Sequence, residues 1–541
     1  MEKRTVENVL TKIFHYIALV LFFTLFINGM FGTGKEQIIG TAPGGISWNQ
    51  EIVFWQRESF IFNLFKLCGI ITILFLIGKL YDIFLSRIHR NLILTVACVF
   101  AGVFSIWWIG AAPTHPVADQ FTICEYAMAF NHGNYEGIQE ISYLTVYPQQ
   151  LGIVTFLRIL FHFFGDMNYR AFQYFSALLI PILVLSGGMI VRHLTDQNGK
   201  AEFYYLLFAL CCAPMYLYVP FVYGDLPSTA LGLLGTWIFL SCLEKFSVPK
   251  VIGLALTLGL MVQLRKNTLI LVIALMVVVV VKLLGKFKWQ VLATGCSVLA
   301  GVLLLQGVLH LTYAGVRDTS LKGIPAFLYL VMGTNDEDGN PGWYNDYTLD
   351  AFTQNGCNPE VAIEKAMVDY KARLREFAEN PGYTLDFYRR KMNYQWNAPM
   401  YQSRIMNFRF NGELKPLAVS VYGGSKMDVL LQGFMKIYQL FMYGSILFLL
   451  FADRKGLKNV EKYVLLIAVF GGFVFSMLWE AKPRYVMPYF LMLVPMYAVA
   501  VEYLLEKTKS GAKAIPSLVK SVISRDKSVD KKDTEKSVEN S

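Results

Sequence analysis

Long apolar runs separated by short polar turns dominate the pattern of positions along this chain. A helix of about 20 apolar residues crosses the roughly 30 Å hydrocarbon core of a bilayer. Runs of about that length cover 13–31, 61–85, 91–112, 172–191, 202–219, 225–243, 250–264, 268–284, 289–311, 428–451, 461–479 and 485–505. The pattern predicts an all-α polytopic membrane protein with a bundle of about 12 transmembrane helices.

A thirteenth apolar segment, from Tyr147 to Gly165, has a different profile. Its polar residues Thr155, Arg158 and His162 recur at helical spacing and form a stripe along one face. Its apolar stretch of about 14 residues is also short for a transmembrane helix. These features predict an amphipathic helix that lies in the membrane interface instead of spanning it.

The distribution of Lys and Arg tests this choice through the positive-inside rule. If the amphipathic helix does not span, both ends of the chain and the basic turns lie on the cytoplasmic side. The residues concerned are Arg87, Arg90, Arg192, Lys200, Lys245, Lys250, Lys282, Lys286, Lys288, Arg454, Lys455, Lys458 and Lys462. If it spans, all the later turns move outside. The interfacial interpretation therefore fits better.

This topology predicts a division of the chain into five parts. They are a two-span addition at 1–90, a transmembrane core at 91–312 with a first external loop at 113–171, a large external loop at 313–427, C-terminal transmembrane helices at 428–505, and a charged, disordered cytoplasmic tail at 506–541. Within the large loop, the sequences "NPEVAIEKAMVDYKARLREFAEN" and "YTLDFYRRKMNYQW" predict two helices, with Pro359 near the start of the first and the Asn380-Pro381 pair after its end.

Composition agrees with this class of protein. Hydrophobic residues make up 55% of the 541 positions and charged residues only 16%, against about a quarter charged in soluble proteins. The net charge of +10 resides largely in short turns and the tail, so it does not indicate a nucleic-acid partner. Six of the eight cysteines fall in apolar runs, whereas Cys124 and Cys357 lie in external loops, where a disulfide between them stays an open alternative.

The ionisable groups that stand out all lie at predicted external ends of helices. Asp119 and Glu125 occur in "PVADQFTICEYAMAFNHG", just after an apolar run, and Asp225 begins another run. Two basic pairs, Arg265–Lys266 and Lys482–Arg484, occupy short external turns. Such groups are costly at a membrane boundary unless they pair or bind something. The basic pairs therefore predict binding of an anionic headgroup, most simply a phosphate.

Each of these residues also has a structural alternative. Asp119 and Asp225 are natural caps at helix starts, and Arg265, Lys266, Lys482 and Arg484 could extend to ordinary lipid headgroups. Glu125 is a secondary candidate that could simply face water, and Tyr147 is a candidate for lining the site. "TNDEDGN", Thr334 to Asn340, has the acids of a calcium loop but not its later bidentate Glu, so a solvated turn is the better interpretation.

Several segments together resemble the GT-C superfamily of membrane glycosyltransferases. They are "PVADQFTICEYAMAFNHGNY", "YPQQLG" at the start of the amphipathic helix, "FVYGDLPS" and "EAKPRYVMPYF". The nearest pattern is that of bacterial relatives of the protein O-mannosyltransferases and of the lipid A aminoarabinose transferase. The Asp-Glu pair usual in that family is Asp119-Gln120 here, and its Pro-Pro element is Pro148-Gln149.

The resemblance implies a glycosyltransferase that uses a polyprenyl-phosphate sugar and an extracytoplasmic glycan, lipid or protein acceptor. Asp119 would be the catalytic base, and Arg265, Lys266, Lys482 and Arg484 would stabilise the leaving phosphate. It implies a bacterial plasma membrane with an external active site, and it leaves open whether a divalent cation assists. The alternatives are a secondary transporter or lipid flippase, and a wall-polymer polymerase or ligase outside the superfamily.

Overall fold

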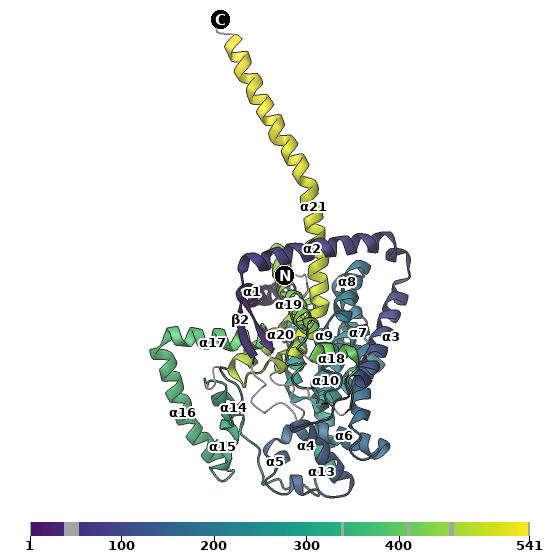
Figure 1. Cartoon of the computed structure of the whole chain (residues 1–541), viewed down its shortest axis with the longest axis vertical. Coiled ribbons are helices and arrows are strands. Elements are labelled where there is room, and N and C mark those ends of the chain that lie inside the picture. Colours follow the sequence, from purple (N-terminus) through teal and green to yellow (C-terminus); the bar gives the residue numbers. More distant parts are fainter. Residues whose placement is uncertain are drawn as a thin grey trace.

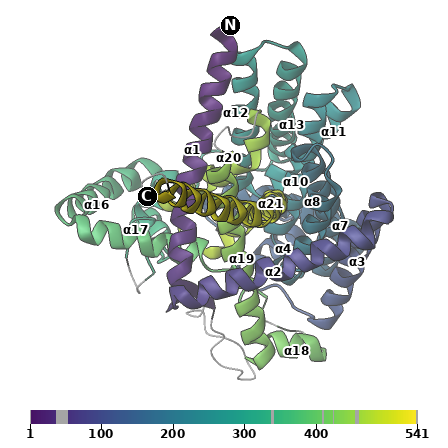
Figure 2. The same ribbon diagram turned by 90° about the horizontal axis from the view of Figure 1, so that it is seen from above.

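The fold is a bundle of long helices with a helical lobe on its side and a helical tail (Figures 1 and 2). The computed structural model describes residues 2–36, 53–336, 340–407, 410, 412–422, 424–453 and 459–538. Ten helices in this part of the chain are long and apolar enough to cross a bilayer. The predicted all-α polytopic architecture is confirmed.

Twelve helical segments correspond to the twelve predicted apolar runs. They are α1 (Glu2–Phe31), α2 (Phe60–Ile83), α3 (Arg90–Ala111), α7 (Tyr169–Leu194), α8 (Gly199–Leu210) with α9 (Ala213–Leu217), α10 (Asp225–Glu244), α11 (Val248–Leu264), α12 (Leu269–Gly285), α13 (Trp289–Tyr313), α19 (Lys426–Ala452), α20 (Val464–Leu478) and α21 (Pro483–Val538). Two of the twelve predicted spans differ from the long helices: α11 has 17 residues, and α8 and α9 divide one span between them.

The remaining elements are short or lie in the connections. The helices are α4 (Asp119–Asn131), α5 (Tyr143–Val146), α6 (Leu151–Phe164), α14 (Ala326–Met332), α15 (Tyr347–Thr353), α16 (Pro359–Glu379), α17 (Pro381–Trp396) and α18 (Pro416–Tyr422). Five 3₁₀ turns are described, at Leu85–Arg87, Glu136–Ile138, Pro148–Gln150, Lys266–Thr268 and Val460–Tyr463. The strands β1 (Gly32–Glu36) and β2 (Val53–Arg57) pair antiparallel, with Gly32 opposite Arg57.

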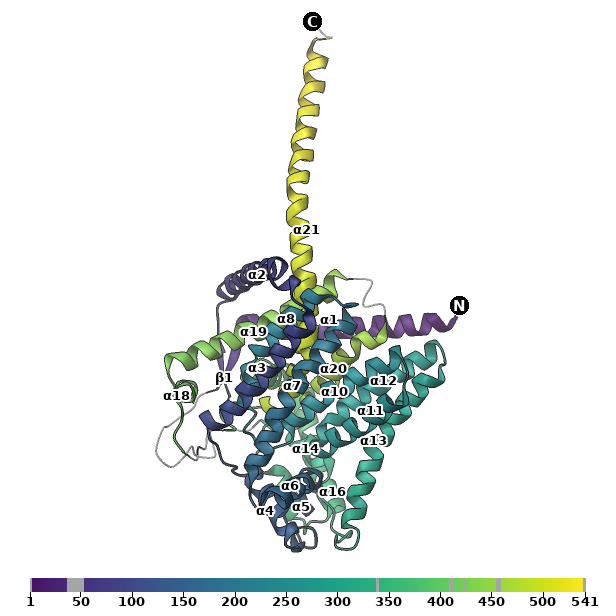
Figure 3. The same ribbon diagram turned by 90° about the vertical axis from the view of Figure 1, so that its right-hand side faces the viewer.

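Loops gather at two ends of the bundle. At one end, called the site face here, the Lys415 amide donates to the Ala111 carbonyl at 2.9 Å and the Ala481 amide to the Gly342 carbonyl at 2.7 Å. At the other end, called the tail face, ion pairs join Lys200 to Asp82, Lys282 to Glu461 and Lys462 to Asp196. Figure 3 shows α4, α5 and α6 at the end opposite the projecting part of α21.

The predicted amphipathic helix corresponds to α6. The chain bends by 109° between the segment ending at Val146 and the one starting at Pro148. One face of α6 is buried, through residues such as Val154, Leu157 and Phe161, while Phe163 and Phe164 are exposed. α6 lies at the site face (Figure 3), with one face of the helix buried and the other exposed.

The large loop folds into a lobe in which both predicted helices are present, as α16 and α17 (Figure 1). Asn358 caps α16 by accepting hydrogen bonds from the Glu360 and Val361 amides, at 2.9 and 3.3 Å. Proline occupies the first position of both helices, where its missing amide hydrogen costs nothing.

The C-terminal tail differs from the expectation of disorder for 506–541. In the structure α21 continues as one helix to Val538.

The division into two faces can be tested by cysteine labelling in a background without the native cysteines. Glu364→Cys lies on the exposed side of α16, and Lys286→Cys lies in the exposed turn between α12 and α13. A membrane-impermeant maleimide should label Glu364→Cys on intact cells but Lys286→Cys only after lysis. Labelling of both from the same side would contradict the twelve-span topology.

Candidate functional site

Asp119 is the first residue of α4, on the site face, and its side chain is exposed. The residue before it, Ala118, has φ of 50° and ψ of −132°, a conformation that costs a residue with a side chain about 1–3 kcal/mol. The strained residue turns the chain into α4 and places the carboxylate at the helix N-terminus. The helix dipole favours negative charge at this position.

Two tyrosines surround this carboxylate. The Tyr143 hydroxyl, on α5, forms side-chain hydrogen bonds with Asp119 and Tyr223, and the Gln150 amide donates to the Tyr223 hydroxyl. Burial, with the negative charge of Asp119 adding to it, raises the pKa of Tyr223 to about 12 and holds that of Tyr143 well above its ordinary value. Both phenols therefore keep their protons at physiological pH and can donate hydrogen bonds.

Asp225 and Arg265 form an ion pair below these tyrosines. Asp225 begins α10, Arg265 ends α11, and the Arg265 Nε lies 3.3 Å from the Asp225 Oδ1. Only 1% of the Asp225 side chain and 13% of the Arg265 side chain are exposed. The pair depends on Gly224, because a Cβ at this residue would lie 1.9 Å from the Leu264 carbonyl oxygen.

Arg484, near the start of α21, brings a second guanidinium group to the same aromatic ring. Its guanidinium carbon lies 5.4 Å from the centre of the Tyr223 ring, and that of Arg265 lies 5.0 Å from it. Both groups also lie within 5.6 Å of the Tyr485 ring centre. The two cations thus come from different predicted basic turns and share one pair of tyrosine rings, where cation–π attraction holds them.

A small pocket opens beside the ion pair, between α10, α12 and α21. Asp225, Arg265, Asn267, Thr268 and Tyr485 give it a polar part. Leu271, Pro488, Tyr489 and Met492 continue it as an apolar part between the helices. A phosphate joined to a hydrocarbon chain has the matching division of polar and apolar groups.

Lys482 and Tyr147 belong to the opposite side of the site. The Lys482 Nζ lies 5.7 Å from the centre of the Tyr344 ring, and Tyr344 is hydrogen-bonded to Tyr147. Burial is the main cause that raises the pKa of Tyr147, and the nearby charges of Asp119 and Glu480 add to it. Tyr147 therefore lies between Asp119 and the segment that carries Lys482.

Two of the predicted residues do not join this arrangement. Glu125 lies six residues along α4 from Asp119, which turns it about 120° away around the helix axis, and its side chain is exposed. Lys266 faces α13, where its ammonium group donates to the Gln306 side chain. The predicted basic pairs are thus each divided, and Arg265 with Arg484 is the pair that the fold brings together.

Sequence reasoning missed the tyrosines that connect these charges. Tyr143, Tyr223, Tyr344 and Tyr485 each lie at a helix end or loop of the site face. Two of them had a signal in the sequence, since Tyr223 and Tyr485 stand within two residues of a predicted ionisable residue. Tyr344 belongs to the segment "PGWYNDY", which the sequence offers as a candidate acceptor surface. Tyr143 had no signal, because only the folded loops bring it near Asp119.

A buried lysine of the lobe fixes the turn that leads to Arg484. Lys391, on α17, donates to the carbonyl oxygens of Gly333 and Trp479, the latter at 2.8 Å. Burial lowers the pKa of Lys391 from 10.5 to about 7, against the attraction of Glu480. The lobe is therefore joined to the turn at 479–482 through main-chain carbonyls.

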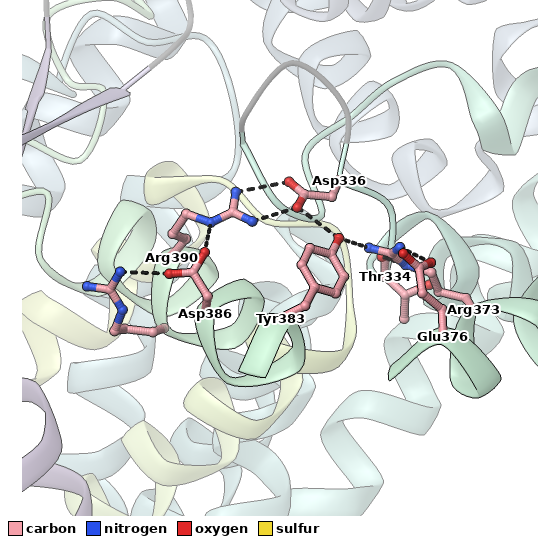
Figure 4. A network of polar contacts seen from close by, with 8 residues as sticks. Thr334, Asp336, Arg373, Glu376, Tyr383, Asp386 and Arg390 are labelled. Atoms are coloured by element: carbon pink, nitrogen blue, oxygen red, sulfur yellow. Dashed lines mark hydrogen bonds and ion pairs between the residues drawn. The ribbon is translucent and has the colours of Figure 1, made fainter. Parts of the chain in front are cut away.

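A polar network in the lobe explains part of the acidic segment from Thr334 to Asn340 (Figure 4). Arg390 binds both oxygens of Asp336, at 3.0 and 2.6 Å, and the Tyr383 hydroxyl donates to the same carboxylate at 2.9 Å. Arg373 donates to the Thr334 carbonyl at 2.7 Å. Asp336 is therefore neutralised by Arg390, while residues 337–339 lie outside the described part of the chain.

Cys124 and Cys357 are free thiols in the structure. Cys124 is buried in the main core, whereas Cys357 packs in the separate small core of the lobe. The alternative of a disulfide between them does not hold.

No protein-family model matches the chain, and no curated protein matches it at a significant level. The geometry of the site is therefore what bears on function.

Asp225→Asn should lower the free energy of unfolding by about 3–5 kcal/mol, because it leaves Arg265 buried without its carboxylate and close to a second guanidinium. Asp82→Asn is the matched control: it removes an ion pair to Lys200 in which Asp82 is 48% exposed, and such pairs contribute at most about 1 kcal/mol. Chemical denaturation in detergent micelles measures both. Equal losses of unfolding free energy in the two variants would show that the buried Asp225–Arg265 pair stabilises the fold no more than the exposed Asp82–Lys200 pair.

Lys391 predicts a pH dependence of stability. The pKa of Lys391 is about 7 in the folded protein, and its ordinary value is 10.5. Between these pH values, the unfolded chain therefore binds more protons than the folded protein. Stability should therefore rise with pH across this window. The melting temperature of the wild type relative to Lys391→Met, which cannot titrate, should increase from about pH 7 to about pH 9. A constant difference would contradict the burial of a titrating amine.

Proposed function

We propose that the chain is an integral membrane glycosyltransferase that moves a sugar from a polyprenyl-phosphate donor to an acceptor on the site face. The observation that carries the proposal is the grouping of Asp119 with Arg265 and Arg484 around Tyr223, beside a pocket that is polar at one part and apolar at the other. An acid, two cations and a hydrocarbon-lined pocket are what transfer from a lipid phosphate requires.

We place the donor phosphate beside Arg265, which lines the pocket, and near Arg484, which lies against the same Tyr223 and Tyr485 rings. A guanidinium group binds phosphate oxygens through paired hydrogen bonds, and Asn267 and Thr268 offer further polar groups in the same pocket. The hydrocarbon chain of the donor then extends along Leu271, Pro488 and Met492 between α12 and α21. This placement leaves the sugar on the side of Tyr223 that faces Asp119.

The reaction is a substitution at the anomeric carbon of the sugar. Asp119 takes the proton of an acceptor hydroxyl, whose oxygen forms a bond to the anomeric carbon. The bond from that carbon to the phosphate oxygen breaks, and its electron pair stays on the phosphate. Arg265 and Arg484 stabilise the negative charge that builds up there, which lowers the barrier more than it stabilises the bound donor.

The acceptor reaches Asp119 from the side of Tyr147, Tyr344 and Lys482. Aromatic rings at this entrance suit the faces of sugar rings, and a cation at 5.7 Å from the Tyr344 ring centre adds affinity for polar groups. We assign the acceptor to the class of extracytoplasmic glycans, lipids or proteins. The basic turns of the tail face support a cytoplasmic assignment for that face under the positive-inside rule. The proposal therefore has the site on the outer side, and the resemblance suggests a bacterial plasma membrane.

Asp119→Asn should lower kcat for sugar transfer by about 100-fold or more, because the amide cannot accept the proton. The assay incubates purified protein with lipid-linked sugars and a soluble glycan or peptide acceptor, and it measures the release of free polyprenyl phosphate. Glu125→Gln is the matched control, since this acid lies on the same helix and is exposed; its rate should stay within about twofold.

Two outcomes would reject the proposed function. One is an unchanged rate of transfer in Asp119→Asn, which would remove the assigned base. The other is movement of an intact lipid or solute across proteoliposomes without release of polyprenyl phosphate, which would favour the transporter or flippase alternative.

A further inference from the structure

A second pocket lies on the site face between the start of α6 and the end of α13. Lys266, Gln306, His310, Tyr313 and Arg317 supply its polar atoms, and Pro148 and Leu151 contribute from the α6 side. The cavity volume is about 40 Å³, about three times the roughly 10–15 Å³ that one water molecule needs. The pocket is separate from the Asp225–Arg265 pocket, because Lys266 and Arg265 leave the same turn in different directions.

The charge of this second pocket is positive. Within the described part of the chain, neither Lys266 nor Arg317 forms an ion pair, and the partner of Lys266 is the neutral Gln306 side chain. The nearest acid in the sequence, Asp318, is fully exposed and accepts a hydrogen bond from the Ser320 amide at 2.8 Å. A lysine, an arginine and a histidine therefore line the pocket, and no carboxylate is among its lining residues.

The surface next to the pocket is apolar and faces outward from the bundle. Leu299 and Leu303 precede Gln306 and His310 on one stripe of α13, at the spacing of a single helix face. These leucines are 43% and 69% exposed. Because α13 is one of the helices that can cross a bilayer, its exposed leucines lie against hydrocarbon and the pocket lies at the end of that surface.

We propose that this pocket binds the phosphate headgroup of an anionic membrane lipid. Lys266 and Arg317 contact the phosphate oxygens, and Tyr313 and His310 complete the polar wall. The hydrocarbon chains lie along Leu299 and Leu303. The site is independent of the proposed sugar transfer, since it uses neither Asp119 nor Arg265, and it would place a bound lipid against the 147–151 segment that borders the candidate active site.

The test uses the full-length protein in phosphatidylcholine nanodiscs that contain a minor share of phosphatidylglycerol. Native mass spectrometry counts the phosphatidylglycerol molecules that stay bound after transfer to detergent. The double variant Lys266→Gln/Arg317→Gln should bind one fewer molecule and show roughly 30-fold weaker affinity at this site, since each cation near a headgroup contributes about fivefold.

The matched control is Lys286→Gln/Lys288→Gln, which removes two exposed cations at the membrane edge of the tail face. It should keep the bound lipid. Equal loss in both double variants would show nonspecific attraction to basic residues and would overturn the site. Equal retention in both would overturn it as well. A melting curve for each variant confirms that the bundle is intact.

A photoactivatable phosphatidylglycerol separates the lipid from other sources of phosphate. Cross-links in the wild type should map to peptides that contain residues 299–317 and should persist in millimolar inorganic phosphate. Displacement by inorganic phosphate would identify a soluble phosphate compound as the ligand and reject the lipid. An Asp119→Asn variant should retain the cross-links. Failure of the proposed sugar transfer can therefore be distinguished from failure of this lipid site.

Discussion

A bilayer offers no water to an ionised side chain, and this constraint decides where the chain places its charges. Where charged side chains are buried, a close partner can compensate: Arg192 and Glu202, in the last turn of α7 and the first turn of α8, are 8% and 2% exposed and 2.6 Å apart. Other ionisable groups lie at the helix ends, where partners or water are available. The ionisable groups of the candidate site lie at such helix ends, on the site face.

The polar site follows from this separation. Asp119, Asp225, Arg265 and Arg484 belong to four segments far apart in the sequence, yet each lies at a helix end on the same face. Tyr223 connects these residues. Its ring contacts both guanidinium groups, and its hydroxyl is hydrogen-bonded to Tyr143 and Gln150. The site therefore exists only when α4, α10, α11 and α21 are assembled.

Much of the architecture could be predicted from the sequence because apolar length and basic turns are local properties. They predicted the long apolar helices and the helices α16 and α17, which the structure contains. The strands β1 and β2 could not be predicted, since "GTGKE" and "VFWQR" lack a shared alternating pattern. The separation of Arg265 from Lys266 also escaped prediction, because a charge pair in a turn does not show which side chain faces which helix.

The turn that follows α11 and carries Arg265 and Lys266 is constrained in its length as well as in its composition. Lys266–Thr268 is a single 3₁₀ turn between two spans, and Gly224 packs against the carbonyl just before it. Adding or removing one residue would rotate both cations out of their pockets while leaving the charge of the turn unchanged. Relatives that share the site should therefore conserve the length of this connection more strictly than its number of basic residues.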